Sequence, residues 1–131
     1  MGGTEGAQVG LTVAHRRYVS HAEAHYAGNL VDGAWGLGLF GDVATEMCIR
    51  TDGDEGLFAS YADVQFLTPV RAGDVVEASA TLTRVGTRSR EMAFTLLVVA
   101  RADASGTSAS ESSMLEIPLV ATTAVGTVVV P

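Results

Sequence analysis

Apolar residues dominate the stretch from Val31 to Ile49, and they fall on nearly every side of a helical projection. This pattern is typical of a helix that other parts of the structure surround. Asp32 stands at its start as a candidate N-cap, and we expect the helix to run to about Arg50. The turn-forming run TDGDEG, residues 51–56, then ends it.

On both sides of this helix, apolar and polar positions alternate with the period of two that is typical of β-strands. Residues 9–19 predict a first strand before the helix. After the helix we expect four strands, two tight connections and one Ser-rich surface loop: strands at 61–66, 76–83, 92–98 and 119–130, connections at 69–74 and 84–90, and the loop at 103–116.

This order of elements, one strand, one helix and then four strands, predicts an α+β protein with an antiparallel sheet. Residues 1–8 are expected to form a flexible tail, and residues 9–131 a single domain. A flat sheet cannot cover so apolar a helix on every side. We therefore predict the hotdog fold, a five-stranded antiparallel sheet that curves around a long central helix.

The high apolar content, 47% of residues against 18% charged, exceeds what such a core needs. A second copy of the chain packed against the helix would bury the remainder, so we expect a homodimer or a larger dimer-based oligomer.

Two features of the helix violate local preferences. Asp42 and Glu46 are four residues apart and so share one face of a segment that is otherwise apolar. Four glycines between residues 33 and 41 each cost roughly 1 kcal/mol relative to alanine. Such violations are expected where function compensates for them, so we expect something to approach this backbone closely at a functional site. The alternative is structural, with Glu46 paired to Arg50 one turn away.

Composition narrows the range of functions. The net charge is −7 and the eight basic residues are all arginine, which argues against nucleic-acid or anionic-membrane partners and excludes Schiff-base lysine chemistry. Cys48 is the one cysteine, which suits a reducing compartment. Neither a signal peptide nor an apolar run of membrane-spanning length is visible, so we expect a cytoplasmic protein.

Four segments, HYAGNLVDGA, LFGDVATEM, TDGDEGLF and PVRAGD, closely resemble the coenzyme A (CoA) thioester ammonia lyases. The resemblance extends over residues 9–101 and the last strand. It implies a carbon–nitrogen lyase that reversibly eliminates ammonia from a substrate like 3-aminobutyryl-CoA or β-alanyl-CoA to give the 2-enoyl-CoA. It implies no cofactor, because CoA is part of the substrate, and the histidines and cysteine show no specific metal-ligand spacing.

On this interpretation Glu46 is the candidate base for the α-proton, and Asp42 holds the ammonium group or polarises water. Burial is expected to raise the pKa of both carboxyl groups. His25 is a further catalytic candidate, although a hydrogen bond to the loop backbone explains it equally well.

The expected binding residues form two groups. The first surrounds the start of the helix, where free N–H groups can stabilise the thioester oxygen: Tyr26, Asn29, Asp32, Gly33 and Ala34. For Tyr26, simple packing is the alternative, and Asn29 is expected to shape the helix entrance through its backbone. The second group follows the third strand and is expected to bind the CoA phosphates or, alternatively, to solubilise a sheet edge: Arg84, Arg88 and Arg90.

Two other functions fit the same fold. An acyl-CoA thioesterase would use a carboxylate to activate water for attack on the carbonyl carbon. A non-catalytic acyl-CoA-binding domain would keep the carboxylates for structural reasons alone.

Overall fold

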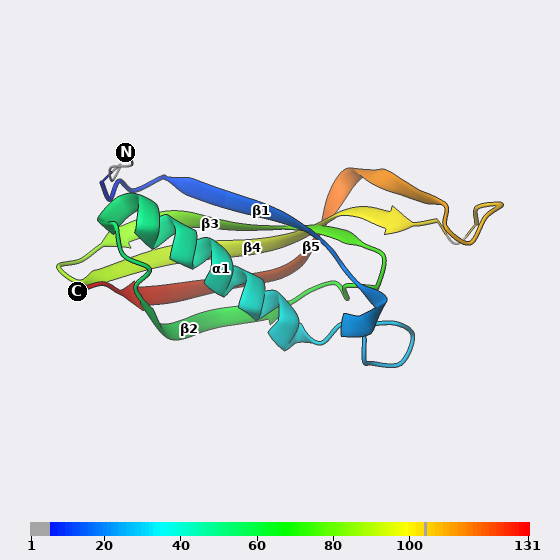
Figure 1. Ribbon diagram of the computed structural model, residues 1–131, viewed down its shortest axis with the longest axis horizontal. Helices are drawn as coiled ribbons and strands as arrows, with labels where there is room; N and C mark the ends of the chain where they lie inside the picture. Colours follow the sequence, from blue (N-terminus) through cyan, green and yellow to red (C-terminus); the bar gives the residue numbers. More distant parts are fainter. Residues whose placement is uncertain (1–5, 104) are drawn as a thin grey trace.

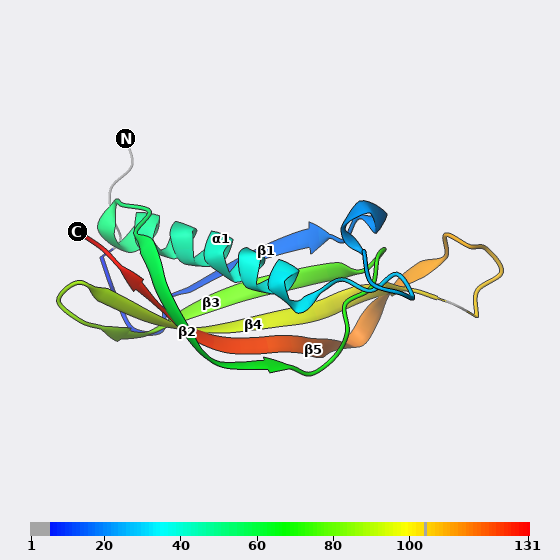
Figure 2. The same ribbon diagram turned by 90° about the horizontal axis from the view of Figure 1, so that it is seen from below.

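One long helix lies along a face of a curved five-stranded sheet in the computed structural model, which describes residues 6–103 and 105–131 (Figures 1 and 2). The elements in chain order are β1 (Thr12–Tyr18), the 3-10 helix η1 (His21–Glu23), α1 (Gly33–Asp52), β2 (Leu57–Phe66), β3 (Val75–Val85), β4 (Ser89–Ala102) and β5 (Ser112–Val129). Most of the predicted tail, residues 1–5, lies outside the described part of the chain.

The sheet has the strand order β1-β3-β4-β5-β2, and every neighbouring pair is antiparallel. β1 and β2 are therefore the two edges. The predicted α+β hotdog architecture is confirmed.

The core lies between α1 and the concave face of the sheet. Alternate residues of β3 and β4, among them Val76, Leu82 and Phe94, are at most 1% exposed. Phe40 of α1 stacks on Phe94 with ring centroids 5.0 Å apart. This period-two burial is the pattern that the sequence predicts for strands covered on one face.

The structure corrects the predicted extent of the last strand. β5 begins at Ser112, within the predicted loop 103–116, because β4 continues to Ala102 and the two strands pair as far as Ala102 and Ser112. The resulting β4–β5 arm projects beyond the rest of the sheet in Figure 1. Backbone pairing stabilises this arm, and the β5 residues within the predicted loop, SSMLE, show no alternation of apolar and polar positions that would predict a strand.

The helix is covered on one face only. Phe40, Val43 and Met47 are fully buried against the sheet, whereas Ile49 is 51% exposed. Its apolar residues all round predicted a helix that is surrounded, but within one chain the outer face of α1 remains open.

The C-terminal end of α1 is tightly closed. Gly53 adopts the left-handed conformation, with φ 66°, and its N–H donates to the Ile49 carbonyl over 3.0 Å. Arg90 of β4 binds Asp52 through two hydrogen bonds of 3.0 and 2.7 Å, and the arginine side chain is only 9% exposed.

Candidate active site

A cavity of about 540 Å³ opens at the N-terminal end of α1; we call it the N-terminal cavity. Its wall is formed by the loop before α1, the first turn of the helix, the segment 66–70 after β2, and two residues of the sheet, Leu96 and Thr122. Apolar and aromatic side chains dominate the lining, with few polar groups, as is usual for sites that bind small acyl groups.

The first backbone amides of α1 have no side-chain cap, and of their residues Gly33 lines the cavity whereas Ala34 does not. Asp32 takes the N-cap backbone conformation, but its carboxylate makes no capping hydrogen bond. It forms a 2.9 Å hydrogen bond with His25 Nε2 instead. Within the described residues, the N–H groups of Gly33 and Ala34 have no acceptor, so they can serve a ligand oxygen.

The loop before α1 is fixed through backbone contacts. Asn29 has a positive φ of 58°, and its carbonyl accepts a 2.9 Å hydrogen bond from the Ala72 N–H. The Val31 N–H donates to the Val70 carbonyl over 2.9 Å. This contact pattern supports the predicted role of Asn29 in shaping the helix entrance, while Tyr26 lines the cavity.

Two glycines of α1 sit where the backbone is approached closely. A Cβ atom at Gly33 would lie 2.5 Å from the Phe66 ring, and one at Gly36 would lie 3.0 Å from Leu96 Cδ2. Both glycines line the N-terminal cavity. These close neighbours are side chains of the protein, and a Cβ at Gly38 or Gly41 would meet nothing within 4 Å. The approach of a thioester to Gly33 stays a prediction.

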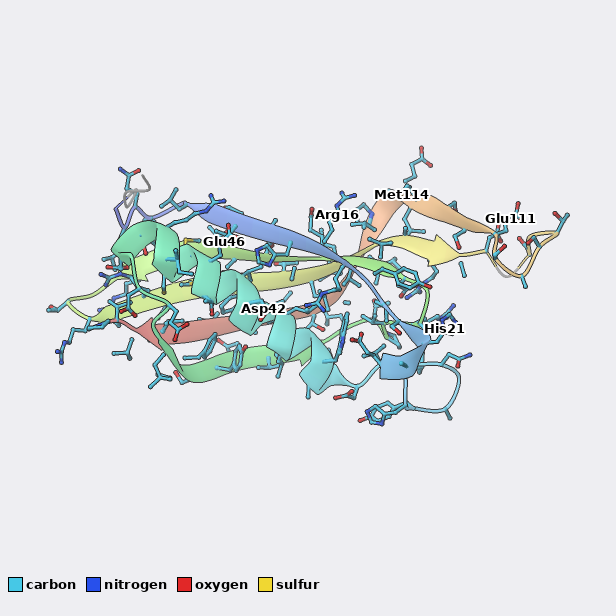
Figure 3. The ribbon with its side chains drawn as sticks, viewed as in Figure 1. Arg16, His21, Asp42, Glu46, Glu111 and Met114 are labelled. Atoms are coloured by element: carbon cyan, nitrogen blue, oxygen red, sulfur yellow. The ribbon has the colours of Figure 1, made fainter. Side chains whose placement is uncertain are left out.

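The two predicted catalytic carboxylates lie farther along α1 (Figure 3). Glu46 is 13 residues after Gly33, which is about 20 Å of helix. Its side chain is turned toward β1, where it forms a 2.8 Å hydrogen bond with His15 and a 2.8 Å ion pair with Arg50. Asp42 lies 3.4 Å from Arg17. In one chain, neither carboxylate lines the N-terminal cavity.

The electrostatic surroundings of Glu46 differ from the expectation. The hydrogen bond with His15, aided by the charge of Arg50, lowers the pKa of Glu46 below its ordinary value despite the opposing effect of partial burial. Burial was predicted to raise this pKa. The pKa of Glu46 is lowered instead because the carboxylate is 35% exposed and has two basic partners.

The hairpin arginines lie at the other end of the helix. Arg84, near the end of β3, and Arg88, in the turn before β4, are exposed. The β3–β4 hairpin that carries them extends beyond the C-terminal end of α1 (Figure 1). Arg90 differs from its predicted place in a phosphate-binding group, because it is buried and bound to Asp52. In one chain, none of the three borders the N-terminal cavity.

Sequence reasoning did not identify several residues of this region. Phe66, Thr68, Leu96 and Thr122 line the cavity, and they come from strands or loops whose alternation indicates only burial. His15, on β1, was not singled out because its partner Glu46 is 31 residues away in the chain.

Two features are absent from residues 6–103 and 105–131. No helix there is long and apolar enough to cross a membrane. No three His, Cys, Asp or Glu side chains gather there in a way that could hold a metal ion.

Residues 29–98 match the family model described as the thioesterase superfamily. The chain belongs to this superfamily of hotdog proteins. A hexameric hotdog-fold thioesterase of Campylobacter jejuni shares the fold, with a TM-score of 0.74 at 18% identity over 89% of this chain and 80% of that one.

Two ammonia lyases are much more similar in sequence. The chain is 49% identical over 115 residues to the 3-aminobutyryl-CoA ammonia lyase of Acetoanaerobium sticklandii, covering 86% of this chain and 89% of the relative. The structure of β-alanyl-CoA:ammonia lyase from Clostridium propionicum superimposes with a TM-score of 0.87 at 35% identity, over 94% of this chain and 87% of that one. The predicted resemblance to this lyase family is confirmed.

Proposed function

We propose that this chain is a cytoplasmic carbon–nitrogen lyase that reversibly eliminates ammonia from a 3-aminoacyl-CoA to give the 2-enoyl-CoA. The observation that carries this conclusion is the 49% identity to 3-aminobutyryl-CoA ammonia lyase over most of both chains. The likeness to β-alanyl-CoA:ammonia lyase supports the same reaction class.

The N-terminal cavity suits the carbonyl end of such a substrate. Removal of the α-proton places negative charge on the thioester oxygen, and the free Gly33 and Ala34 amides at the positive end of α1 would stabilise that charge. The β-amino group then leaves as ammonia when the electron pair of the broken C–H bond forms the double bond. The Phe66 ring lies against Gly33 in this chain, so the thioester would approach the helix backbone there after this exposed ring turns aside.

Proton transfer is assigned to Glu46 as the base, with Asp42 holding the ammonium group. About 20 Å of helix separates Glu46 from Gly33, so Glu46 must serve a cavity that belongs to a second copy. We assign His25 the positioning of Asp32, its hydrogen-bond partner and a carboxylate that lines the cavity of the same chain. The competing assignment, with Asp32 as the base, can be separated from the first by mutation.

The exposed apolar surface supports an assembly of at least two copies. Leu57, Phe66 and Leu67 are 59–77% exposed on or next to the edge strand β2, and Ile117 on β5 is 81% exposed. Burial of such side chains between copies would stabilise an oligomer. Contacts of Arg84 and Arg88 with CoA phosphates also require a second copy, because their hairpin is remote from the cavity of their own chain.

The direct test is the addition of ammonia to crotonyl-CoA. A lyase lowers the absorbance of the enoyl thioester at a rate that rises with ammonium concentration, and it releases no free thiol. Release of thiol without dependence on ammonia would instead identify a thioesterase. Binding of the thioester without either change would identify a non-catalytic domain.

A further inference from the structure

Arg71 is an exposed arginine that directly follows Val70, a lining residue of the N-terminal cavity. The residues that precede it, 66–70, line the cavity. Arg71 itself forms an isolated β-bridge with Leu30, in the loop that leads into α1. Its position is therefore fixed next to the helix entrance.

The turn that carries Arg71 is braced by a buried ion pair. Asp74 is completely buried, and its Oδ2 accepts a 2.8 Å hydrogen bond from the Arg71 N–H. Arg101 of β4 donates to both oxygens of Asp74, over 3.0 and 2.9 Å, and also to the Pro69 carbonyl. Asp74 is thus neutralised by Arg101, and the Arg71 side chain keeps its charge for another partner.

A second cavity, of about 300 Å³, lies directly beyond this turn. Arg71, Arg101 and Asp103 line it, together with residues 106–109 of the β4–β5 arm. The two cavities therefore adjoin the same turn, one lined by Val70 and the other by Arg71.

The other arginines either form ion pairs with carboxylates or lie far from the N-terminal cavity. Five of the eight form ion pairs with carboxylates: Arg16, Arg17, Arg50, Arg90 and Arg101. Within the described residues, Arg71, Arg84 and Arg88 have no carboxylate partner. The β3–β4 hairpin that carries Arg84 and Arg88 extends beyond the opposite end of α1 (Figure 1). Arg71 is therefore the arginine beside this cavity whose charge is available to an anion.

We propose that Arg71 binds a phosphate group of the CoA moiety whose acyl end occupies the N-terminal cavity of the same chain, with the nucleotide directed toward the second cavity. The proposal rests on the proposed function, because it takes a CoA thioester as the substrate. It differs from the predicted hairpin site in using a residue next to the cavity. A guanidinium suits this role, since it forms paired hydrogen bonds with phosphate oxygens.

The test compares calorimetric binding of free CoA with that of pantetheine, which has the same thiol arm and no phosphate. Arg71→Gln should weaken CoA binding about 10-fold or more, the usual loss of a charge-assisted hydrogen bond, and should leave pantetheine binding unchanged. Arg16→Gln is the matched control, because it removes the same charge from an exposed site on β1. An unchanged melting temperature would show that each variant is folded.

Three results would overturn the proposal. Arg71→Gln could bind CoA as tightly as the wild type; it could lose CoA and pantetheine equally; or the loss could appear only in an Arg84→Gln/Arg88→Gln variant. Because this assay measures binding and not turnover, its outcome is independent of the ammonia-addition assay. Failure of the lyase proposal alone would leave the difference between CoA and pantetheine in place.

Discussion

The two ends of α1 have opposite characters. At the C-terminal end, Gly53 caps the helix and the Arg90–Asp52 ion pair fixes it to β4. At the N-terminal end, Asp32 turns its carboxylate to His25 and leaves the first amides without partners beside a large cavity. Satisfied polar groups stabilise a structure, whereas unsatisfied ones at a cavity are available to a ligand. We therefore infer that the C-terminal end of α1 stabilises the fold and that its N-terminal end binds the substrate.

The largest expected effect is on stability, at the closed end. Asp52→Ala removes one partner of a largely buried ion pair and leaves Arg90 uncompensated, so the free energy of unfolding should fall by about 3 kcal/mol. Denaturant unfolding measures this change. Glu55→Ala, an exposed carboxylate nearby, is the control and should change stability by less than about 0.5 kcal/mol. A loss of activity in folded Asp52→Ala, at unchanged stability, would contradict the comparison.

The same ion pair should make stability depend on pH. Hydrogen bonds from Arg90 hold the pKa of Asp52 below its ordinary value of 3.8, so the folded state binds fewer protons than the unfolded state in the acidic range. The stabilisation is fully present above the unfolded pKa and is lost as the pH falls through the lowered folded value. Asp52→Asn should therefore show a shallower loss of stability in acid than the wild type.

Glu46→Gln tests whether the middle of the helix participates in the chemistry. If Glu46 removes the α-proton, kcat for elimination should fall by about a hundredfold or more while the melting temperature changes little. The parallel variant Asp32→Asn provides the comparison, because Asp32 lines the cavity of its own chain. Near wild-type turnover in Glu46→Gln, together with a large loss in Asp32→Asn, would contradict this assignment. The base would then be Asp32 of the Asp32–His25 pair.

Gly33→Ala tests the N-terminal end of α1, the open end, by adding one methyl group. The added methyl group would meet the Phe66 ring at 2.5 Å and intrude on the cavity, so we expect kcat/KM to fall about 10-fold. Stability should change by less than about 1 kcal/mol, because the exposed Phe66 ring can rotate and alanine is the better helix former. Gly38→Ala, where a Cβ would meet nothing within 4 Å, should leave KM unchanged. Equal effects of the two variants would argue against the cavity as the thioester site.

The smallest effect is a shift of a pH profile. His15 lowers the pKa of Glu46 through its hydrogen bond, so His15→Gln should raise that pKa. If unprotonated Glu46 is the base, the acid limb of the kcat profile then moves to higher pH. His21→Gln, which changes an exposed histidine far from Glu46, should leave the limb in place. If the acid limb does not shift in His15→Gln, Glu46 is not the group that accepts the proton in the rate-determining step.

The predictions from sequence succeeded where local periodicity specifies structure. The apolar helix and the alternating strands were placed within a few residues, apart from β5, whose first half is held by pairing with β4. The site was harder to predict, because it depends on contacts between distant segments. The free amides of Gly33 and Ala34 follow from helix geometry, but the partners of Glu46 and the burial of Arg90 depend on how β1 and β4 pack against α1.

A crystal structure with butyryl-CoA, which carries no amino group to eliminate, would show directly where the substrate binds. We expect the acyl carbonyl oxygen roughly 2.7–3.1 Å from the Gly33 or Ala34 amide nitrogen, with the acyl chain in the N-terminal cavity. An acyl group bound at the closed end of α1, near Asp52 and the β3–β4 hairpin, would contradict the assignment of substrate binding to the open end.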